Sequence, residues 1–403
     1  MTAVIVGIVL LTYAGVALGS VPRTRMNRAT IALVGAAALV AVGAVTEEEA
    51  VHAIDLGTLL LLGAMMVINN NLRMAGFFTL VTNRVLALAK SPRMLLAVII
   101  GASGVLSALF LNDTICLMLT PLLADVTLRL RRDPLPYLIG LAVATNVGSV
   151  ATITGNPQNI LIGQSSRIGY VDFLIALGPI ALIGLVICWL VIVLIYRDEF
   201  RKPLDAITLP PGSLYRPLLN RTLLIVLGML AAFLLGLPIV TSACVAAGAL
   251  LISRLRPGKL LALDWELLLM FSGLFVVTGV IEVSGLSAAL FEQISPFLKS
   301  GLAEFTLAVG ALSNVVSNVP AVLLLRPEIP TFDNPRQAWL ALAMASTLAG
   351  NLTLLGSAAT LIVAELARAK GITLGFMAFL KVGVPVTILT LLVGVAWLTV
   401  FPG

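Results

Sequence analysis

Two polar patches interrupt stretches of this chain that are otherwise apolar enough for lipid. The first is Asn112-Asp113-Thr114, and the second runs from Thr154 to Asn159 and reads Thr-Gly-Asn-Pro-Gln-Asn. An unsatisfied polar group in hydrocarbon costs several kcal/mol, so such patches need a reason. Amides and hydroxyls can replace the hydration of a small substrate without fixing a net charge. We therefore interpret the two patches as one half of a substrate site.

The second half of the chain carries a degenerate copy of these patches, which indicates an internal duplication. Ile54-Asp55-Leu56 recurs as Leu263-Asp264-Trp265, and Gly76 recurs as Gly285 at the same offset. The candidate site residues are then drawn from both halves. They are Asn112, Asp113, Thr114, Thr154, Gly155, Asn156, Gln158 and Asn159 from the first half, and Ser313, Asn314, Ser317, Asn318, Asn351, Thr353, Gly356, Ser357 and Thr360 from the second.

Each of these residues has an alternative interpretation. Ser, Thr and Asn often cap helix ends or join helices in membranes. Four clusters at duplicated positions are harder to explain in that way than any single residue, so the site is the favoured interpretation.

Asp113 is the sharpest individual candidate because its counterpart in the second half is Val319. Ionisable groups at membrane depth are rare and typically functional. Our hypothesis is that Asp113 carries a coupling proton or binds a coupling cation such as sodium. The alternative is an acid that caps the second arm of a hairpin. We expect no cofactor and no bound metal beyond such a coupling ion.

The composition is that of a polytopic membrane protein. Of the 403 residues, 60% are hydrophobic and 11% are charged, against about 25% charged in ordinary soluble domains. The net charge of +6 lies in short loops between apolar runs, so it reports topology and not nucleic-acid binding. The single histidine and the three scattered cysteines offer no metal-ligand or nucleophile pattern, and no paired carboxylates stand at a break, so an enzyme is not expected. A channel is less easily excluded, although no repeated pore helix or charge ring is visible.

The polar patches should interrupt helices. Short apolar arms flank the first patch, which favours a re-entrant hairpin at about 93–128, and Gly155 with Pro157 should break a helix at about 137–165. The second half repeats this order. We expect its hairpin at about 304–326, its broken helix at about 338–368, repeats over 1–200 and 218–403, and a cytoplasmic linker over 201–217.

Loop charge gives an orientation for this arrangement. If neither hairpin crosses, each half crosses five times and the halves are inverted. Most basic residues then fall in cytoplasmic loops, as the positive-inside rule requires. We expect an all-α polytopic membrane protein of two inverted repeats, each with five crossings, one re-entrant hairpin and one broken helix. It should lie in the plasma (inner) membrane, with the N- and C-termini outside.

Four motifs in this order are similar to a known group of proteins. They are Asn112-Asp113-Thr114, the run Gly155 to Asn159, the run Ser313 to Pro320, and Gly356-Ser357-Ala358-Ala359-Thr360. Together they resemble the ion transporter superfamily. Within it, the likeness is to the arsenite permease and sodium/proton antiporter group, which includes plant silicon effluxers and bacterial anion permeases. The resemblance implies a scaffold and a transport domain in each half, hairpin tips that form the site, and a homodimer that works by an elevator-like shift.

The resemblance also bears on the substrate. Related sodium-coupled dicarboxylate carriers favour Ser-Asn-Thr at both tips, whereas here the tips read Asn-Asp-Thr and Ser-Asn-Val. No Lys or Arg lies in any polar patch, which favours a neutral or weakly charged substrate. We expect a lipid-embedded secondary transporter of a small inorganic oxyacid or anion, with proton-coupled efflux of arsenite or antimonite as the leading hypothesis. The alternative is a sodium- or proton-coupled carrier of di- or tricarboxylates or other anions.

Overall fold

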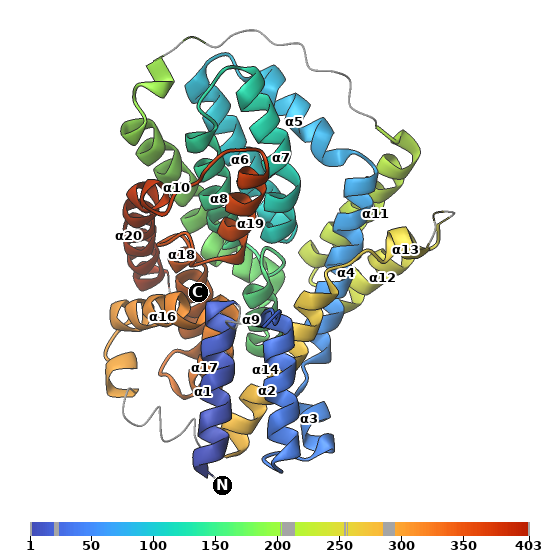
Figure 1. The fold of residues 1–403 in the computed structure, drawn as a ribbon, viewed down its shortest axis with the longest axis vertical. Helices are drawn as coiled ribbons and strands as arrows, with labels where there is room; N and C mark the ends of the chain where they lie inside the picture. Colours follow the sequence, from blue (N-terminus) through green and yellow to red (C-terminus); the bar gives the residue numbers. More distant parts are fainter. Residues whose placement is uncertain are drawn as a thin grey trace.

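The computed structural model describes residues 2–19, 24–201, 203, 214–253, 255, 257–284 and 295–401. Gly285 and most of the expected linker 201–217 lie outside these ranges. The described chain folds into helices, and Figure 1 shows their arrangement. The helices of the first half are α1 (Thr2–Leu18), α2 (Arg28–Ala41), α3 (Glu47–Ala53), α4 (Leu56–Met74), α5 (Phe77–Leu88), α6 (Pro92–Leu109), α7 (Asn112–Arg129), α8 (Pro134–Ser149), α9 (Pro157–Ser166), α10 (Tyr170–Ile195) and the 3-10 helix η1 (Glu199–Arg201).

The second half follows the same order. Its helices are α11 (Arg216–Leu234), α12 (Ile239–Leu251), α13 (Pro257–Leu260), α14 (Trp265–Val283), α16 (Leu302–Val316), α17 (Asn318–Leu325), the 3-10 helix η2 (Arg326–Thr331), α18 (Pro335–Ala349), α19 (Ala358–Ala369) and α20 (Phe376–Val400). Asp55 and Asp264 cap α4 and α14 in the same way, since each side chain accepts a hydrogen bond from a backbone N–H three residues on.

Five of the described helices are long and apolar enough to cross a membrane: α6, α10, α11, α14 and α20. The pair α3 and α4, bent by 54°, is a possible sixth span. The helices α1, α2, α5, α12 and α16 are apolar but shorter. This content confirms the expected all-α membrane class.

The first expected hairpin consists of α6 and α7, whose turn is made by Phe110 and Leu111 in extended conformation. Asn112 to Thr114 therefore form the first turn of α7 and do not lie in the loop itself. Each arm has 18 residues, or about 27 Å at 1.5 Å per residue. Pro121 lies inside α7 without ending it.

The second hairpin is less regular. α16 passes directly into α17 through Ser317, which has φ 75° and ψ 161°. This left-handed region is strained for any residue with a Cβ, so the turn depends on the packing around it. The second arm has only eight residues before η2 continues the chain.

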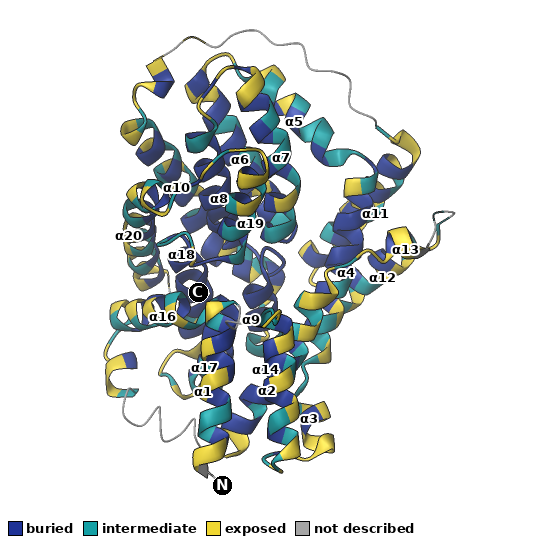
Figure 2. Cartoon of the chain, in the orientation of Figure 1, coloured by how far each residue is buried: buried dark blue, intermediate teal, exposed yellow. Residues whose placement is uncertain are grey.

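Most of the helices fall into two groups by packing, and α5 lies between them, in contact with α4, α6 and α7. We call α6–α10 with α16–α20 the central group, and α1–α4 with α11–α14 the flanking group. Within the central group α6 packs on α8, α16 on α18, and α10 on α20; within the flanking group α14 packs on α2 and α12 on α4. Figure 2 shows that burial concentrates in α8, α9 and α18 at the middle of the molecule.

Small residues let each hairpin lie close to its broken helix, as is usual for membrane helices. A Cβ on Gly148 of α8 would collide with the backbone of Gly104 in α6. In the second half, a Cβ on Gly310 of α16 would lie 3.5 Å from Cβ of Ala349 in α18. The two contacts therefore occupy corresponding places in the two halves.

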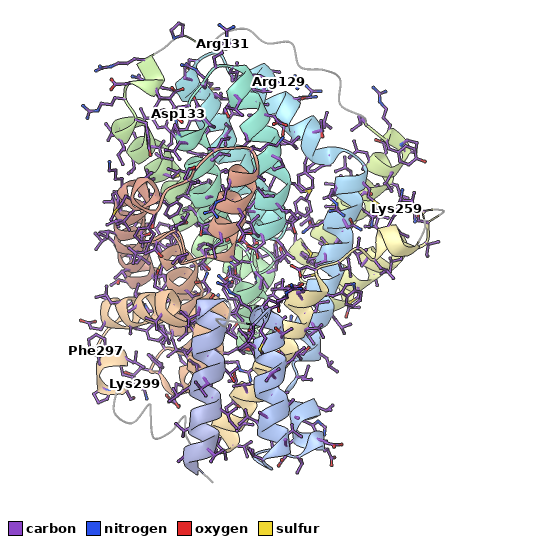
Figure 3. The ribbon with its side chains drawn as sticks, viewed as in Figure 1. Arg129, Arg131, Asp133, Lys259, Phe297 and Lys299 are labelled. Carbon is purple, nitrogen blue, oxygen red and sulfur yellow. The ribbon has the colours of Figure 1, made fainter. Side chains whose placement is uncertain are left out.

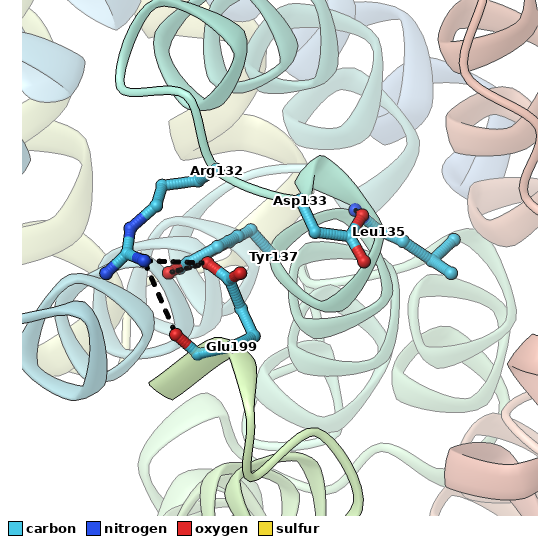
Figure 4. Close-up of polar contacts among 5 residues, drawn as sticks. All are labelled: Arg132, Asp133, Leu135, Tyr137 and Glu199. Atoms are coloured by element: carbon cyan, nitrogen blue, oxygen red, sulfur yellow. Dashed lines mark hydrogen bonds and ion pairs between the residues drawn. The ribbon is translucent and has the colours of Figure 1, made fainter. Parts of the chain in front are cut away.

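A buried ion pair joins Arg132 to Glu199, and Figure 4 shows its contacts. Arg132 Nη1 lies 3.6 Å from Oε1 of Glu199, and the hydroxyl of Tyr137 donates to the same oxygen at 3.3 Å. The cluster joins the start of α8 to the segment that follows α10. In Figure 3, Arg129 and Arg131 mark one end of the molecule, whereas Phe297 and Lys299 lie at the opposite end. Which end faces the cytoplasm stays a prediction.

Candidate functional site

The first hairpin tip is fastened to the break between α8 and α9. The backbone N–H of Asn112 donates to the carbonyl of Gly155 at 3.0 Å, and its side-chain amide donates to Oδ1 of Asn146 at 3.0 Å. Asn112 Oδ1 also accepts from the N–H of Asp113. The tip and the break thus form one polar unit in the buried centre.

Polar residues of the first break cap α9 and satisfy backbone carbonyls in the break. Asn156 caps α9, and Pro157 at the first helical position needs no N–H partner. The amide of Asn159 donates to the carbonyl of Ser149, at the end of α8, and to the carbonyl of Thr152 in the break. Gly155 is required here because a Cβ would collide with the backbone of Ser149.

The second break has an equivalent construction. Ser357 caps α19, and the hydroxyl of Thr360 donates to the carbonyls of Leu354 and Ser357. Asn314 of the second hairpin donates to the carbonyl of Ala349 at 2.9 Å, at the end of α18. A Cβ on Gly356 would lie 2.9 Å from Oδ1 of Asn314.

The two breaks are bonded to each other. Asn156 donates to the hydroxyl of Thr347 at 3.1 Å, and the hydroxyl of Ser357 donates to Oδ1 of Asn146 at 3.1 Å. In each case the cap of one broken helix meets the last turn of the other. Asn146 also donates to Oδ1 of Asn351 at 2.9 Å. These reciprocal contacts are what a duplicated chain predicts.

A small pocket of about 60 Å³ lies between the two tips and the flanking group. The starts of α7, α9, α17 and α19 all contribute to its lining, so helix N-termini, which favour negative charge, converge there. From the flanking group come Val16, Arg28, Leu267 and Met270. The lining residues that the sequence predicted are Asn112, Asp113, Gln158, Ser317, Asn318 and Ser357. Asp113 and Val319, the pair at which the tips differ, both line it.

The remaining predicted residues do not line this pocket. Gly155, Asn156, Asn159, Asn314, Asn351, Gly356 and Thr360 shape or bond the two breaks, as described above. Thr114 accepts a hydrogen bond from Asn69 of α4 at 3.2 Å. Thr154 and Ser313 are buried, and Thr353 is half-buried with its carbonyl accepting from Gly356 N–H.

Several buried oxygens near the breaks have no hydrogen-bond partner among the described residues. They are Ser107 Oγ and Asn159 Oδ1 in the first half, and Ser313 Oγ, Asn314 Oδ1 and Asn318 Oδ1 in the second. Buried acceptors without donors are costly, and a cation or an ordered water can offset that cost.

Sequence reasoning missed four residues of this region. Asn146 and Thr347 lie three and two residues before the end of a broken helix, inside runs that are otherwise small and apolar. Asn69 belongs to the run Asn69-Asn70-Asn71 in an apolar helix, a signal that could have found it. Arg28 is one of the basic residues that follow the first apolar run, and nothing local in the sequence indicates that it lines the pocket.

An all-α membrane protein whose broken helices and hairpin tips meet at a polar centre has the architecture of a secondary transporter. A model of the citrate transporter family (CitMHS) matches residues 13–349, so the chain belongs to that family. It is a multi-pass membrane protein and a secondary transporter of this type. The family match confirms the resemblance to the ion transporter superfamily.

Relatives and a solved structure agree with this assignment. The silicon efflux transporter LSI3 of Oryza sativa subsp. japonica is 29% identical over 93% of each chain. The putative transporter arsB of Dictyostelium discoideum is 23% identical over 92% of this chain and 87% of its own. The YdaH transporter of Alcanivorax borkumensis aligns with 100% of this chain and 98% of its own at a TM-score of 0.59 and 16% identity, a likeness of fold.

Proposed function

We propose that the protein exports a small inorganic oxyacid of the arsenite or antimonite type, coupled to protons. The observation that supports this most is the size and chemistry of the pocket between the tips. Its volume of about 60 Å³ is several times the ~10–15 Å³ that a cavity needs to hold one water molecule. A molecule of a few heavy atoms fits such a space, and the amides and hydroxyls of the lining match its hydroxyl groups.

A carrier of di- or tricarboxylates is the second candidate. The family's description, four helix N-termini and Arg28 all favour binding of a carboxylate. The unpaired oxygens of Ser313 and Asn318 are the kind of hard ligand that a coupling sodium ion prefers. Asp113 in the same lining would repel a carboxylate, however, and Arg28 is the basic residue among the described lining residues, so a tricarboxylate would carry more negative charge than the lining offsets.

Flux into proteoliposomes separates the two candidates. Purified protein is reconstituted, a pH or sodium gradient is imposed, and uptake of arsenite, antimonite, silicic acid, citrate and succinate is measured. Saturable uphill flux of an oxyacid driven by the pH gradient is the expected result. Uphill flux of citrate or succinate alone would establish the second candidate, and strictly downhill flux of every compound would point to a channel.

Asp113 is the proposed coupling residue, because it is the acidic side chain in the lining and the residue at which the two tips differ. Asp113→Asn keeps the shape but cannot exchange a proton at neutral pH. We expect this variant to lose uphill transport while it still equilibrates substrate down a gradient. Asp198→Asn, at an exposed aspartate, is the control. Gradient-driven transport at the wild-type level in Asp113→Asn would remove the coupling role.

A further inference from the structure

Arg28 is the first residue of α2, and its backbone is firmly placed. Asn27 and Thr30 form a capping box at this helix start, in which the Asn27 side chain accepts from the Thr30 N–H and the Thr30 side chain accepts from the Asn27 N–H. The amide of Asn27 also donates to Oε2 of Glu266 at 2.6 Å, in the first turn of α14. Two flanking helices therefore start together beside the tips, and Arg28 extends from that junction.

The half-buried side chain of Arg28 lines the pocket opposite the first tip. Among the lining residues that the structure describes, Arg28 and Asp113 are the charged ones. Across the described residues no ion pair joins Arg28 to Asp113 directly. The two residues therefore line the same pocket without pairing with each other.

The chemistry of these two groups is complementary. A guanidinium donates hydrogen bonds and cannot accept them, whereas a carboxylate only accepts. A hydroxyl group can donate to the carboxylate and accept from the guanidinium at the same time. An undissociated oxyacid carries several such hydroxyls. A fully ionised carboxylate has none to donate, so it would meet Arg28 well and Asp113 poorly.

We propose that Arg28 completes the substrate site from the flanking group, holding one substrate oxygen while Asp113 accepts a hydrogen bond from another. This proposal rests on the proposed function. It makes Arg28 a specificity-determining residue, and it places the substrate across the boundary between the flanking and central groups. Affinity then depends on how the two groups are positioned relative to each other.

The test compares Arg28→Gln, Arg28→Lys and the control Arg25→Gln, which removes an exposed charge three residues away. Initial rates of proteoliposome uptake are measured over a range of arsenite concentrations. Size-exclusion profiles verify that each variant is folded. We expect Arg28→Gln to raise the KM roughly 10- to 100-fold, the usual loss for a hydrogen bond to a charged group, with little change in the maximum rate. Arg28→Lys keeps the charge without the planar fork and should be intermediate. Arg25→Gln should match the wild type.

Each other outcome overturns the proposal in a recognisable way. A wild-type KM in a folded Arg28→Gln protein would mean that Arg28 does not contact substrate. If Arg28→Gln does not fold, a KM in Arg28→Lys equal to that of the wild type and of Arg25→Gln would mean the same. A lower maximum rate at an unchanged KM would place Arg28 in the movement of the protein instead. Failure of the wild type to transport any oxyacid would overturn the proposed function, and this inference with it.

Discussion

Asn146 connects more of the site than any residue predicted from the sequence. Its Oδ1 accepts from Asn112 of the first tip and from Ser357 of the second break, and its Nδ2 donates to Asn351. One buried amide thus bonds to a hairpin and to both ends of the opposite break. Because buried polar groups cannot replace a lost partner with water, each of these hydrogen bonds depends on the others being formed.

Asn146→Ala should therefore destabilise the protein by about 1–3 kcal/mol, since three buried partners lose a hydrogen bond. It should also weaken transport, because Asn112 at the tip loses its anchor. Ser346→Ala is the matched control, as that buried hydroxyl bonds only to carbonyls of its own helix. Thermal unfolding in detergent and proteoliposome flux measure the two effects. Equal melting temperatures for the two variants would contradict this role of Asn146.

At the scale of single residues, the sequence identified the polar residues of the hairpin tips and breaks, but it did not predict the hydrogen bonds between them. Asn112 and Asn159 were predictable because an unsatisfied amide in an apolar segment is costly, so each amide there must have a partner or a ligand. Their roles differ, however: Asn112 lines the pocket, whereas Asn159 satisfies carbonyls freed by its own break. The residue type is the same in both cases, so only geometry separates a residue that lines the pocket from one that satisfies the backbone.

At the scale of helices, the contact between α6 and α8 fixes the first hairpin. Gly104 and Gly148 allow the two backbones to touch, and the tip then meets the break at Gly155. The first hairpin and the first broken helix are therefore packed as one unit.

Gly148→Ala should therefore destabilise the protein by about 1–3 kcal/mol, because the added methyl group has only the backbone of Gly104 to push against. Gly101→Ala lies in α6 where a Cβ meets nothing within 4 Å, and it should leave stability unchanged or slightly higher. Melting temperatures of the two variants provide the comparison. A Gly148→Ala protein as stable as Gly101→Ala would show that this helix pair has room to adjust.

The sequence predicted the positions of the helix breaks better than the residues that form the hairpin turns. Gly and Pro mark the first break plainly, and α8 ends and α9 begins on either side of it. The hairpin turn was misplaced by a residue or two because Asn112 and Asp113 are as well suited to a helix start as to a loop. The strained backbone of Ser317 left no trace in the sequence, since serine is an ordinary residue at a turn.

At the scale of the whole molecule, the pocket joins parts that are far apart in the chain. Arg28 and Met270 reach it from flanking helices of different halves. Periodicity and motifs describe one segment at a time, so neither could place these residues beside the tips. No Lys or Arg lies in the polar patches themselves, but Arg28 of α2 joins them in the lining of the pocket.

The hydrogen bonds from Asn156 to Thr347 and from Ser357 to Asn146 have a consequence for biosynthesis. A half-length chain made alone would present unpaired amides to lipid and would be a substrate for quality-control proteases. Two separate chains, 1–201 and 214–403, should recognise each other and co-purify when they are expressed together, whereas each alone should be degraded. Accumulation of either fragment by itself, or failure of an affinity tag on one to retain the other, would count against this. If the fragments do assemble, the peptide link between the halves is dispensable, and the reciprocal caps hold the transporter together as they would a heterodimer.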